Sequence, residues 1–351
     1  MDKPFLKRLR RIDPYVPGEQ PQSDDIIKLN ANESPYPPAP GVQQALRDFD
    51  TSRLALYPDA NGKALKTALA NRFGVKPSQV FLGNGSDDVL ALAFQSFFCS
   101  DEPVLYPDIT YSFYPVWCDL FRIPYETVPL DENFCVNIRD YDRSNGGIVL
   151  PNPNAPTGRG VSLAFLEDLL QHNADCVVII DEAYVDFGAQ SAVPLIEKYE
   201  NLLVVQTMSK SRSLAGLRIG YALGSETLIA TLEAVKNSYN SYTMDAVALA
   251  AGEAAVADEA YFQETCRKVV DTRERTADAL RGLGFVVPPS LTNFLFVTHP
   301  DKNASDIFAA LRERGIFIRY FKLPRIDNYL RITVGTDEQM DRLIDALRDL
   351  L

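Results

Sequence analysis

The sequence predicts an α/β protein with a large, doubly wound, mostly parallel sheet domain and a smaller α+β domain. Short apolar runs alternate with longer amphipathic stretches through about residue 236, which is typical of strands connected by helices. From residue 246 the pattern changes to long helical stretches and a few short strands. Chains longer than about 250 residues usually form more than one core. We therefore expect an N-terminal arm at 1–35 that packs with the small domain, a large domain at 36–240 and a small domain at 241–351.

Five short apolar runs predict the strands of the large domain, because each is shorter than a helix and bounded by polar residues. They lie at 104–106, 147–150, 176–180, 202–206 and 218–223. Amphipathic periodicity predicts helices at 63–73, where Gly74 provides a stop, and at 87–98, 163–171 and 228–236. The proline-rich segment 35–40 cannot be the interior of a helix, so we expect it to link the arm to the large domain.

The last third of the chain predicts helices and short strands in turn. An alanine-rich stretch predicts a helix at 246–257, and a longer helix at 261–283 ends before Gly284. The elements expected after it are a strand at 294–297, a helix at 304–314, a strand at 330–334 and a helix at 338–350.

Composition argues against several classes of protein. The chain has 35 Lys and Arg against 47 Asp and Glu, a net charge of −12, which disfavours binding to nucleic acid or to an anionic membrane. Its two histidines, His172 and His299, have no partner at metal-ligand spacing, so a zinc site or a histidine-based triad is disfavoured. The five cysteines show no paired spacing, and no run approaches the about 20 apolar residues of a membrane helix. We expect a cytoplasmic protein without a metal.

A lysine follows the apolar run at 202–206. Lys210 lies in a loop of small polar residues directly after this predicted strand, where desolvation favours a neutral amine suited to Schiff-base chemistry. Ser209 and Arg218 are expected to hold an anion nearby. A solvated lysine in a surface loop explains this segment alone equally well.

An aspartate ends the apolar run at 176–180. A buried carboxylate is costly without a partner, so Asp181 should face a cation such as a protonated ring nitrogen, and Tyr184 could offer a phenol to the same ligand. The alternative is that Asp181 caps a following helix, which is the commoner role of such a residue.

Glycines and a hydroxyl open the predicted helix at 87–98. The N–H groups of Gly85, Ser86 and Asp87 would form an anion site for phosphate, although an ordinary helix cap explains the motif as well. The motif lacks the third glycine of a dinucleotide site and the Lys-Ser/Thr pair of a P-loop, which disfavours NAD and ATP.

Two further segments could line a ligand site. The loop at 151–158 carries three prolines after a strand, where ligands of doubly wound folds bind. Aromatic residues gather at 111–117 and could stack on a ring, although a helical core is the more usual role for such spacing.

Together and in this order, these segments resemble the fold-type I pyridoxal-phosphate aminotransferases, and most of all the histidinol-phosphate aminotransferases among them. The resemblance spans essentially the whole chain. The motifs that carry it lie at 29–35, 57–59, 83–87, 156–158, 181–184, 209–218 and 330–335.

The resemblance implies pyridoxal 5'-phosphate as the cofactor and a role for each motif. Lys210 would bind the cofactor covalently and move the proton, and Asp181 would pair with the pyridinium nitrogen. Tyr184 would bond to the ring 3-oxygen, and Tyr111 would stack on the ring. The residues implied for the cofactor phosphate are Gly85, Ser86, Asp87, Ser209, Arg218 and, from a second subunit of a homodimer, Tyr57.

One position departs from the family pattern. The asparagine that usually precedes Pro-Thr-Gly is Ala155 here, so either Asn154 reaches the 3-oxygen instead or that bond is missing.

The resemblance also implies a substrate site. Arg331, with Arg319 as its helper, would bind the substrate anion, because a guanidinium fork suits both a carboxylate and a phosphate. An ordinary surface salt bridge is the alternative. Asn32 is a further implied substrate residue, and Tyr15, by its position in the arm, could close over the substrate.

The resulting hypothesis is an aminotransferase of histidine biosynthesis that acts on L-histidinol phosphate and 2-oxoglutarate. An aromatic amino-acid aminotransferase would share every cofactor motif, and a phospho-amino-acid decarboxylase of the same fold is a second alternative. A regulatory module is a third, but only about thirty residues precede Asn30, fewer than the about 50 of a typical DNA-binding domain.

Overall fold

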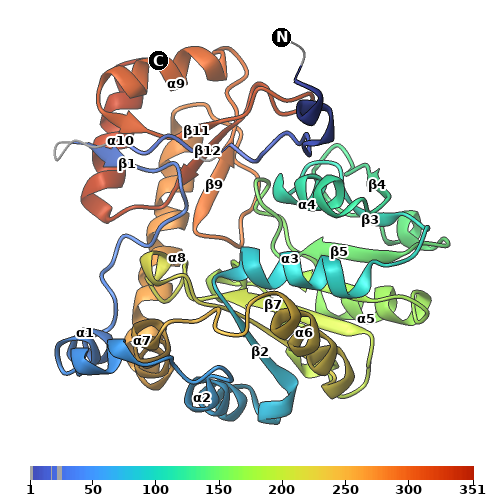
Figure 1. Cartoon of the computed structure of the whole chain (residues 1–351). Helices are drawn as coiled ribbons and strands as arrows, with labels where there is room; N and C mark the ends of the chain where they lie inside the picture. Colours follow the sequence, from blue (N-terminus) through green and yellow to red (C-terminus); the bar gives the residue numbers. More distant parts are fainter. Residues whose placement is uncertain (1–2, 17, 22–25) are drawn as a thin grey trace.

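The computed structural model describes residues 3–16, 18–21 and 26–351. Its largest sheet has seven strands and lies at the centre of the large unit (Figure 1). The strand order is β2-β8-β7-β6-β5-β3-β4, and β8 runs antiparallel to both of its neighbours while the other pairs are parallel. The strands are β2 (Val80–Gly83), β3 (Val104–Pro107), β4 (Tyr125–Val128), β5 (Gly147–Pro151), β6 (Val178–Asp181), β7 (Leu202–Thr207) and β8 (Gly220–Gly224). The predicted doubly wound, mostly parallel sheet is confirmed.

Helices cover both faces of this sheet. Alternate residues of a strand point to opposite faces, so Ile148 and Leu150 pack on one side while Val149 packs on the other. The first face is covered by α1 (Pro40–Arg47), α2 (Lys63–Phe73), α5 (Leu163–His172) and α7 (Ala246–Ala257). The second face is covered by α3 (Ser86–Phe97), α4 (Phe113–Phe121) and α6 (Glu226–Tyr239).

The predicted strict alternation of strands and helices is wrong at three connections if only α-helices are counted, because only 3-10 helices lie between β4 and β5, between β6 and β7 and between β7 and β8. Between β7 and β8 the chain reverses through a loop that contains only the 3-10 helix η7 (Ala215–Leu217), so the two strands pair as antiparallel neighbours. The predicted strand at 218–223 also begins later, at Gly220, because Arg218 adopts a left-handed backbone conformation with φ of 52°. Because β7 runs parallel to β6, the Lys210 loop that follows β7 lies at the edge of the sheet where the neighbouring parallel strands end.

A second unit includes the end of the long helix α8 (Glu259–Gly282), whose Ala277 and Leu280 lie in its core. It contains the antiparallel sheet β11-β12-β9 and the parallel pair β1-β10. Its elements are β1 (Ile27–Lys28), β9 (Phe294–Val297), α9 (Ala304–Glu313), β10 (Ile316–Phe317), β11 (Arg319–Tyr320), β12 (Leu330–Thr333) and α10 (Asp337–Arg348). The remaining 3-10 helices are η1 (Pro4–Arg8), η2 (Thr51–Ala55), η3 (Pro77–Gln79), η4 (Ile138–Tyr141), η5 (Val185–Phe187) and η6 (Val193–Leu195).

Helix α7 packs with the large unit. Ala248 and Ala251 lie in the same core as Val42 of α1 and Leu65 of α2. We therefore propose that the small domain begins with α8 rather than at residue 241.

The N-terminal arm contacts both units. Leu29 packs in the core of the small unit, and Ile27 pairs with Ile316. Tyr15 stacks on Phe113 of the large unit, with ring centroids 4.3 Å apart. Residues 1–2, 17 and 22–25 of the expected arm at 1–35 lie outside the described residues.

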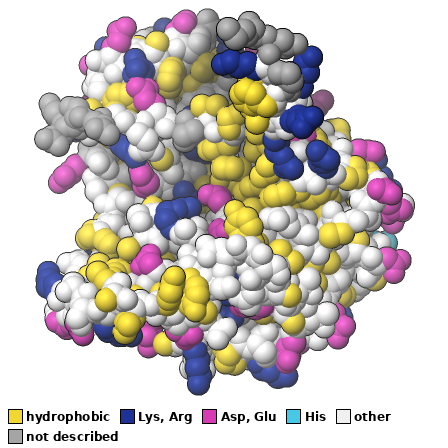
Figure 2. Space-filling model, in the orientation of Figure 1, with side chains coloured by type: hydrophobic (Ala, Val, Ile, Leu, Met, Phe, Trp, Pro, Cys, Tyr) yellow, Lys and Arg dark blue, Asp and Glu magenta, His cyan; other side chains and the backbone are white. Residues whose placement is uncertain are grey.

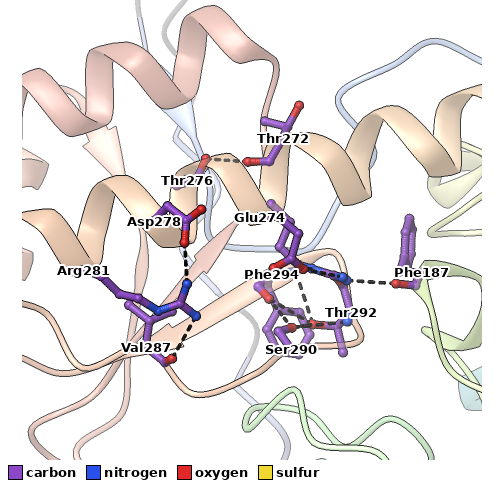
Figure 3. A network of polar contacts seen from close by, with 11 residues as sticks. Phe187, Thr272, Glu274, Thr276, Asp278, Arg281, Val287, Ser290, Thr292 and Phe294 are labelled. Carbon is purple, nitrogen blue, oxygen red and sulfur yellow. Dashed lines mark hydrogen bonds and ion pairs between the residues drawn. The ribbon is translucent and has the colours of Figure 1, made fainter.

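A polar network beside α8 joins the two units (Figure 3). The buried Arg273 donates hydrogen bonds to the carbonyl oxygen of Phe187 (2.9 Å), which ends η5, and to that of Thr292 (2.8 Å), which precedes β9. Ser290 also bonds to the carbonyl oxygen of Phe294 at 2.7 Å. The two bonds of Arg273 join η5 of the large unit to the segment that precedes β9. Among the described residues, no helix has the length and apolarity needed to cross a membrane.

Candidate active site

A cavity of about 260 Å³ lies where the carboxyl ends of β5, β6 and β7 face the small antiparallel sheet. Ligands of doubly wound folds bind at this edge, because the connecting loops diverge there. The expected site residues that line it are Tyr15, Asn32, Ser86, Asp87, Tyr111, Asp181, Tyr184, Ser209, Lys210, Arg218, Arg319 and Arg331. Gly85 directly precedes two of them. The cavity therefore gathers residues that lie up to about three hundred positions apart in the sequence.

Asp181 ends β6 and is 5% exposed. Its Oδ2 accepts a hydrogen bond from the Tyr114 hydroxyl at 2.7 Å, and its Oδ1 accepts one from the Ala183 backbone N–H at 3.1 Å. Burial raises the pKa of this carboxyl to about 6, although the two hydrogen bonds oppose the rise. The next 3-10 helix begins with Tyr184 as its N-cap, so the helix-cap alternative for Asp181 is not realised.

Lys210 points toward the cavity. Its Nζ donates to the carbonyl oxygen of Ala31 at 3.2 Å and lies 5.7 Å from the ring centroid of Tyr184. The lysine is half-buried between the β7–β8 loop and the arm, which differs from the alternative of a solvated surface lysine.

Asn32 holds the hydroxyl of Tyr184. Its Nδ2 donates to that oxygen at 2.9 Å, and Asn32 is in turn fixed by two hydrogen bonds with the Thr333 hydroxyl, at 3.0 and 3.1 Å. Because the Tyr184 oxygen accepts from Asn32, its own proton is free for donation into the cavity. Sequence reasoning missed Thr333.

The start of α3 forms an anion cradle. Its N-cap Gly85 has no side chain that could accept from the first amides, and a Cβ at this position would lie 2.5 Å from Nη2 of Arg218. Arg218 bonds to Ser209 Oγ and to a carboxylate oxygen of Asp87, both at 3.3 Å. Free helix N–H groups, a hydroxyl and a guanidinium together suit a phosphate.

Tyr111 forms one wall of the cavity. Its hydroxyl donates to Asp87 Oδ1 at 2.9 Å, and its ring meets that of Tyr114 edge to face at 5.7 Å. Burial, followed by the charge of Asp87, raises the pKa of the Tyr111 phenol, so the ring stays neutral. A neutral, fixed aromatic face is suited to stacking against a flat ligand.

Arg331 and Arg319 lie opposite each other on neighbouring antiparallel strands. Nη2 of Arg331 donates to the carbonyl oxygen of Asn30 at 2.9 Å, while its buried Nε has no partner among the described residues. Burial, together with repulsion from Arg319, lowers the pKa of Arg331. Neither arginine pairs with a carboxylate within the described ranges, so the salt-bridge alternative is not realised. An unpartnered buried guanidinium nitrogen indicates an anionic ligand.

Asn154 does not line the cavity, and its expected bond to the 3-oxygen stays a prediction. Its Nδ2 donates to the carbonyl oxygen of Ile109 (2.9 Å) and to Thr157 Oγ1 (3.0 Å), and its Oδ1 accepts from Thr110 (2.9 Å). Ile109 and Thr110 belong to the loop after β3 and Thr157 to the same loop as Asn154, and these bonds use both amide hydrogens, while Ala155 lines the cavity. The spacing of residues in an irregular loop does not fix where a side chain points.

Tyr57 does not line this cavity either. It is 81% exposed and stacks on Tyr242 with centroids 4.5 Å apart. Its expected role, in which it reaches the site of a second subunit, stays a prediction.

Sequence reasoning also missed the hydrogen bond that Tyr114 donates to Asp181. The signal was present in the aromatic cluster at 111–117, which has the usual pattern of helical core, and Tyr114 is in fact fully buried there. No spacing rule linked this cluster to Asp181, which lies 67 residues further along the chain.

The residues present fit pyridoxal 5'-phosphate. The cradle at α3 suits its phosphate, the buried Asp181 lacks a cation that a protonated pyridine would supply, and Lys210 faces the same cavity. No cluster of three or more His, Cys, Asp or Glu that could hold a metal ion occurs in the part of the chain that the structure describes.

Comparisons with known proteins agree with this chemistry. The family model for "Aminotransferase class I and II" matches residues 24–347. A histidinol-phosphate aminotransferase of Acinetobacter baumannii (strain SDF) is 55% identical over 97% of this chain and 95% of its own length. Histidinol-phosphate aminotransferase 2 of Dechloromonas aromatica (strain RCB) is 54% identical over 100% and 99%.

One similar solved structure contains a bound cofactor. Histidinol-phosphate aminotransferase from Sinorhizobium meliloti, in complex with pyridoxal-5'-phosphate, superposes with a TM-score of 0.83 at 28% identity, covering 93% of this chain and 92% of the other. The chain therefore belongs to the class I and II aminotransferases, a pyridoxal-phosphate-dependent family.

Proposed function

We propose that this chain is an aminotransferase that converts L-histidinol phosphate and 2-oxoglutarate to 3-(imidazol-4-yl)-2-oxopropyl phosphate and L-glutamate. The observation that carries the proposal is the position of Arg319 and Arg331, which line the same cavity as Lys210 and Asp181. Neither arginine forms an ion pair with a carboxylate among the described residues, and Nε of Arg331 is buried without a hydrogen-bond partner there. The two curated relatives that carry this enzyme name are 54–55% identical over nearly their whole length, which supports the same substrate.

Pyridoxal 5'-phosphate, when bound, supplies an electron sink for the negative charge that develops at the substrate Cα. We assign its phosphate to the N–H groups at Ser86 and Asp87, with Ser209 and Arg218 beside them. Asp181 would face the pyridine nitrogen, and Tyr111 would cover the ring face.

Lys210 and Tyr184 would transfer or donate protons in the reaction. Lys210 would first attach the cofactor. Its amine, once released, would remove the proton from the substrate Cα and deliver it to C4′ of the cofactor. Tyr184 would donate its free proton to the ring 3-oxygen, because Asn32 occupies one of the lone pairs of its hydroxyl. With Ala155 in place of the usual asparagine, Tyr184 would be the side-chain donor to that oxygen.

The arginine pair accounts for two different substrates. L-histidinol phosphate presents a phosphate ester where L-glutamate presents a carboxylate, and a guanidinium fork binds either anion in bidentate geometry. Arg331 is held by Asn30 through one nitrogen, which leaves Nε for the ligand.

A neighbouring groove of about 800 Å³ shares Tyr15 and Phe321 with this cavity. We further propose that the imidazole of the substrate lies in this groove, beside these two aromatic rings. In Figure 2, hydrophobic side chains gather beside the N-terminal segment, close to a group of Lys and Arg.

We also propose a cytoplasmic homodimer. Leu56 (72% exposed) and Tyr57 (81%) are adjacent in the chain, and Tyr57 stacks on the exposed Tyr242 (45%), so together they form an apolar surface that a second copy would cover and from which Tyr57 would reach the partner's phosphate site. The five cysteines are all free thiols, which fits a reducing compartment.

The test is a panel of amino donors, scored by conversion of the bound cofactor to its pyridoxamine form. L-histidinol phosphate should react much faster than phenylalanine, and the reaction should need 2-oxoglutarate to turn over. Equal rates would favour the aromatic amino-acid alternative, and release of carbon dioxide without a 2-oxo acid would favour the decarboxylase. Lys210→Ala should abolish the reaction, whereas Lys198→Ala, at an exposed lysine outside the cavity, should not.

A further inference from the structure

We propose that Tyr114 is a positioning residue for the reaction, because its hydroxyl fixes the Asp181 carboxylate in the orientation that receives the pyridine nitrogen of the cofactor. This inference rests on the proposed function, since it needs the cofactor ring at Asp181.

The geometry gives each oxygen of Asp181 its own donor. The Tyr114 hydroxyl reaches Oδ2 at 2.7 Å from helix α4, and the Ala183 N–H reaches Oδ1 at 3.1 Å from the same loop as Asp181. Both side chains of the Tyr114–Asp181 pair are buried, so water does not compete for these bonds. A carboxylate held at both oxygens cannot rotate, and hydrogen bonds to an ionised group are about twice as strong as neutral ones.

Tyr114 can act only as the donor in this pair. Burial, and then the Asp181 charge, raises the pKa of its phenol well above the ordinary value, so the proton stays on the phenol. The ring is wedged among aromatic neighbours, with Tyr106 and Tyr111 both at 5.7 Å between centroids and Phe94 at 6.1 Å. The hydroxyl direction is therefore set by packing before any ligand arrives.

The chain offers a matched control in Tyr106. This residue lies in the same aromatic cluster and is 1% exposed, but its buried hydroxyl has no hydrogen-bond partner among the described residues. Tyr106→Phe and Tyr114→Phe each remove one hydroxyl from that cluster, and only the second loses a bond to Asp181. Because both replacements keep the ring, both variants should fold, which thermal unfolding checks directly.

Binding of pyridoxal 5'-phosphate to the cofactor-free protein is the first readout. Trp117, the single tryptophan of the chain, lies 6.3 Å from Tyr111 and 6.2 Å from Tyr114 between ring centroids, so quenching of its fluorescence reports ligand at this site. We expect Tyr114→Phe to weaken binding about tenfold or more, and Tyr106→Phe to leave it within about twofold.

The second readout is the proton on the pyridine nitrogen, measured by NMR with ¹⁵N-labelled pyridoxal 5'-phosphate. Without the Tyr114 bond the Asp181 carboxylate is a stronger base, so the resonance should move toward that of a neutral pyridine in Tyr114→Phe and not in Tyr106→Phe. In the Asp181→Asn background, Tyr114→Phe should add little to the loss of affinity, because its effect passes through Asp181.

The outcomes separate the two proposals. Wild-type affinity and an unmoved resonance in Tyr114→Phe would overturn the positioning role alone, as would fully additive losses in the double variant. Absence of pyridoxal-phosphate binding to the wild type would overturn the proposed function and this inference together.

Discussion

The cofactor-free protein should lose stability as the pH rises, because Asp181 is buried without a cation. Burial raises the pKa of its carboxyl from 3.8 to about 6. The folded state therefore holds this proton more tightly than the unfolded state, and the stability linked to it is present below about pH 4 and lost as the pH rises through about 6. One pKa unit corresponds to about 1.4 kcal/mol, so the loss amounts to about 3 kcal/mol of the free energy of unfolding.

Urea unfolding of the cofactor-free wild type and Asp181→Asn, at a series of pH values from about 4 to 8, measures this term. Other carboxyl groups, including the buried Glu182 with its pKa of about 7, titrate in both proteins and cancel in the difference. The free energy of unfolding of Asp181→Asn minus that of the wild type should rise by about 3 kcal/mol between pH 4 and 7 and then level off. Saturating pyridoxal 5'-phosphate should stabilise the wild type more than the variant. A difference that stays flat or falls with pH would refute the reasoning.

Three further predictions concern other parts of the site. Gly220→Ala should weaken cofactor binding more than tenfold, measured by fluorescence quenching, because its Cβ would lie 2.3 Å from the backbone of Gly85 and Ser86; unchanged affinity would count against the assigned phosphate cradle. Arg331→Lys should lower kcat/KM for L-histidinol phosphate by about a hundredfold or more, because the fork that replaces water around the anion is lost, and steady-state kinetics with intact cofactor absorbance would check this. Leu56→Glu should shift the protein from dimer toward monomer in sedimentation velocity, and an unshifted dimer would mean that this surface is not the interface.

Much of the fold could be predicted because the periodic signals were strong and local. The bounds of α2, α7 and β9 are those expected from periodicity and helix stops. The direction of β8 could not be predicted, because a reversal and a crossover both begin with a polar loop. The short strand β1 was missed because its two residues are fixed by pairing with β10, nearly three hundred residues away.

In the candidate site, too, the residues that follow predicted strands could be placed from the sequence, whereas those that depend on contacts between distant elements could not. Asp181 and Lys210 follow apolar strands, and the carboxyl ends of parallel strands meet at one edge, so their shared cavity follows from sequence order. Tyr114 lies on the helix that follows β3, and only β5 separates β3 from the strand β6 that carries Asp181, so the contact depends on strand order rather than on sequence spacing. Asn154 bonds to Ile109 in the loop after β3 and to Thr157 in its own loop, and the first of these contacts cannot be found from the motif alone.

The electrostatics of the cavity describe its ligand. At one end, burial raises the pKa of the Asp181 carboxyl, which means that the site favours a neighbouring cation. At the other end, burial and Arg319 lower the pKa of Arg331, which means that the site favours an anion there. A cationic ring at the first end and a phosphate or carboxylate at the second would offset both costs at once. An overall charge of −12 is compatible with anionic ligands, because binding depends on the few cationic side chains that the fold places at the cavity. Desolvation makes these charged groups costly in the empty protein, and the same low dielectric strengthens their interaction with the ligands once these bind.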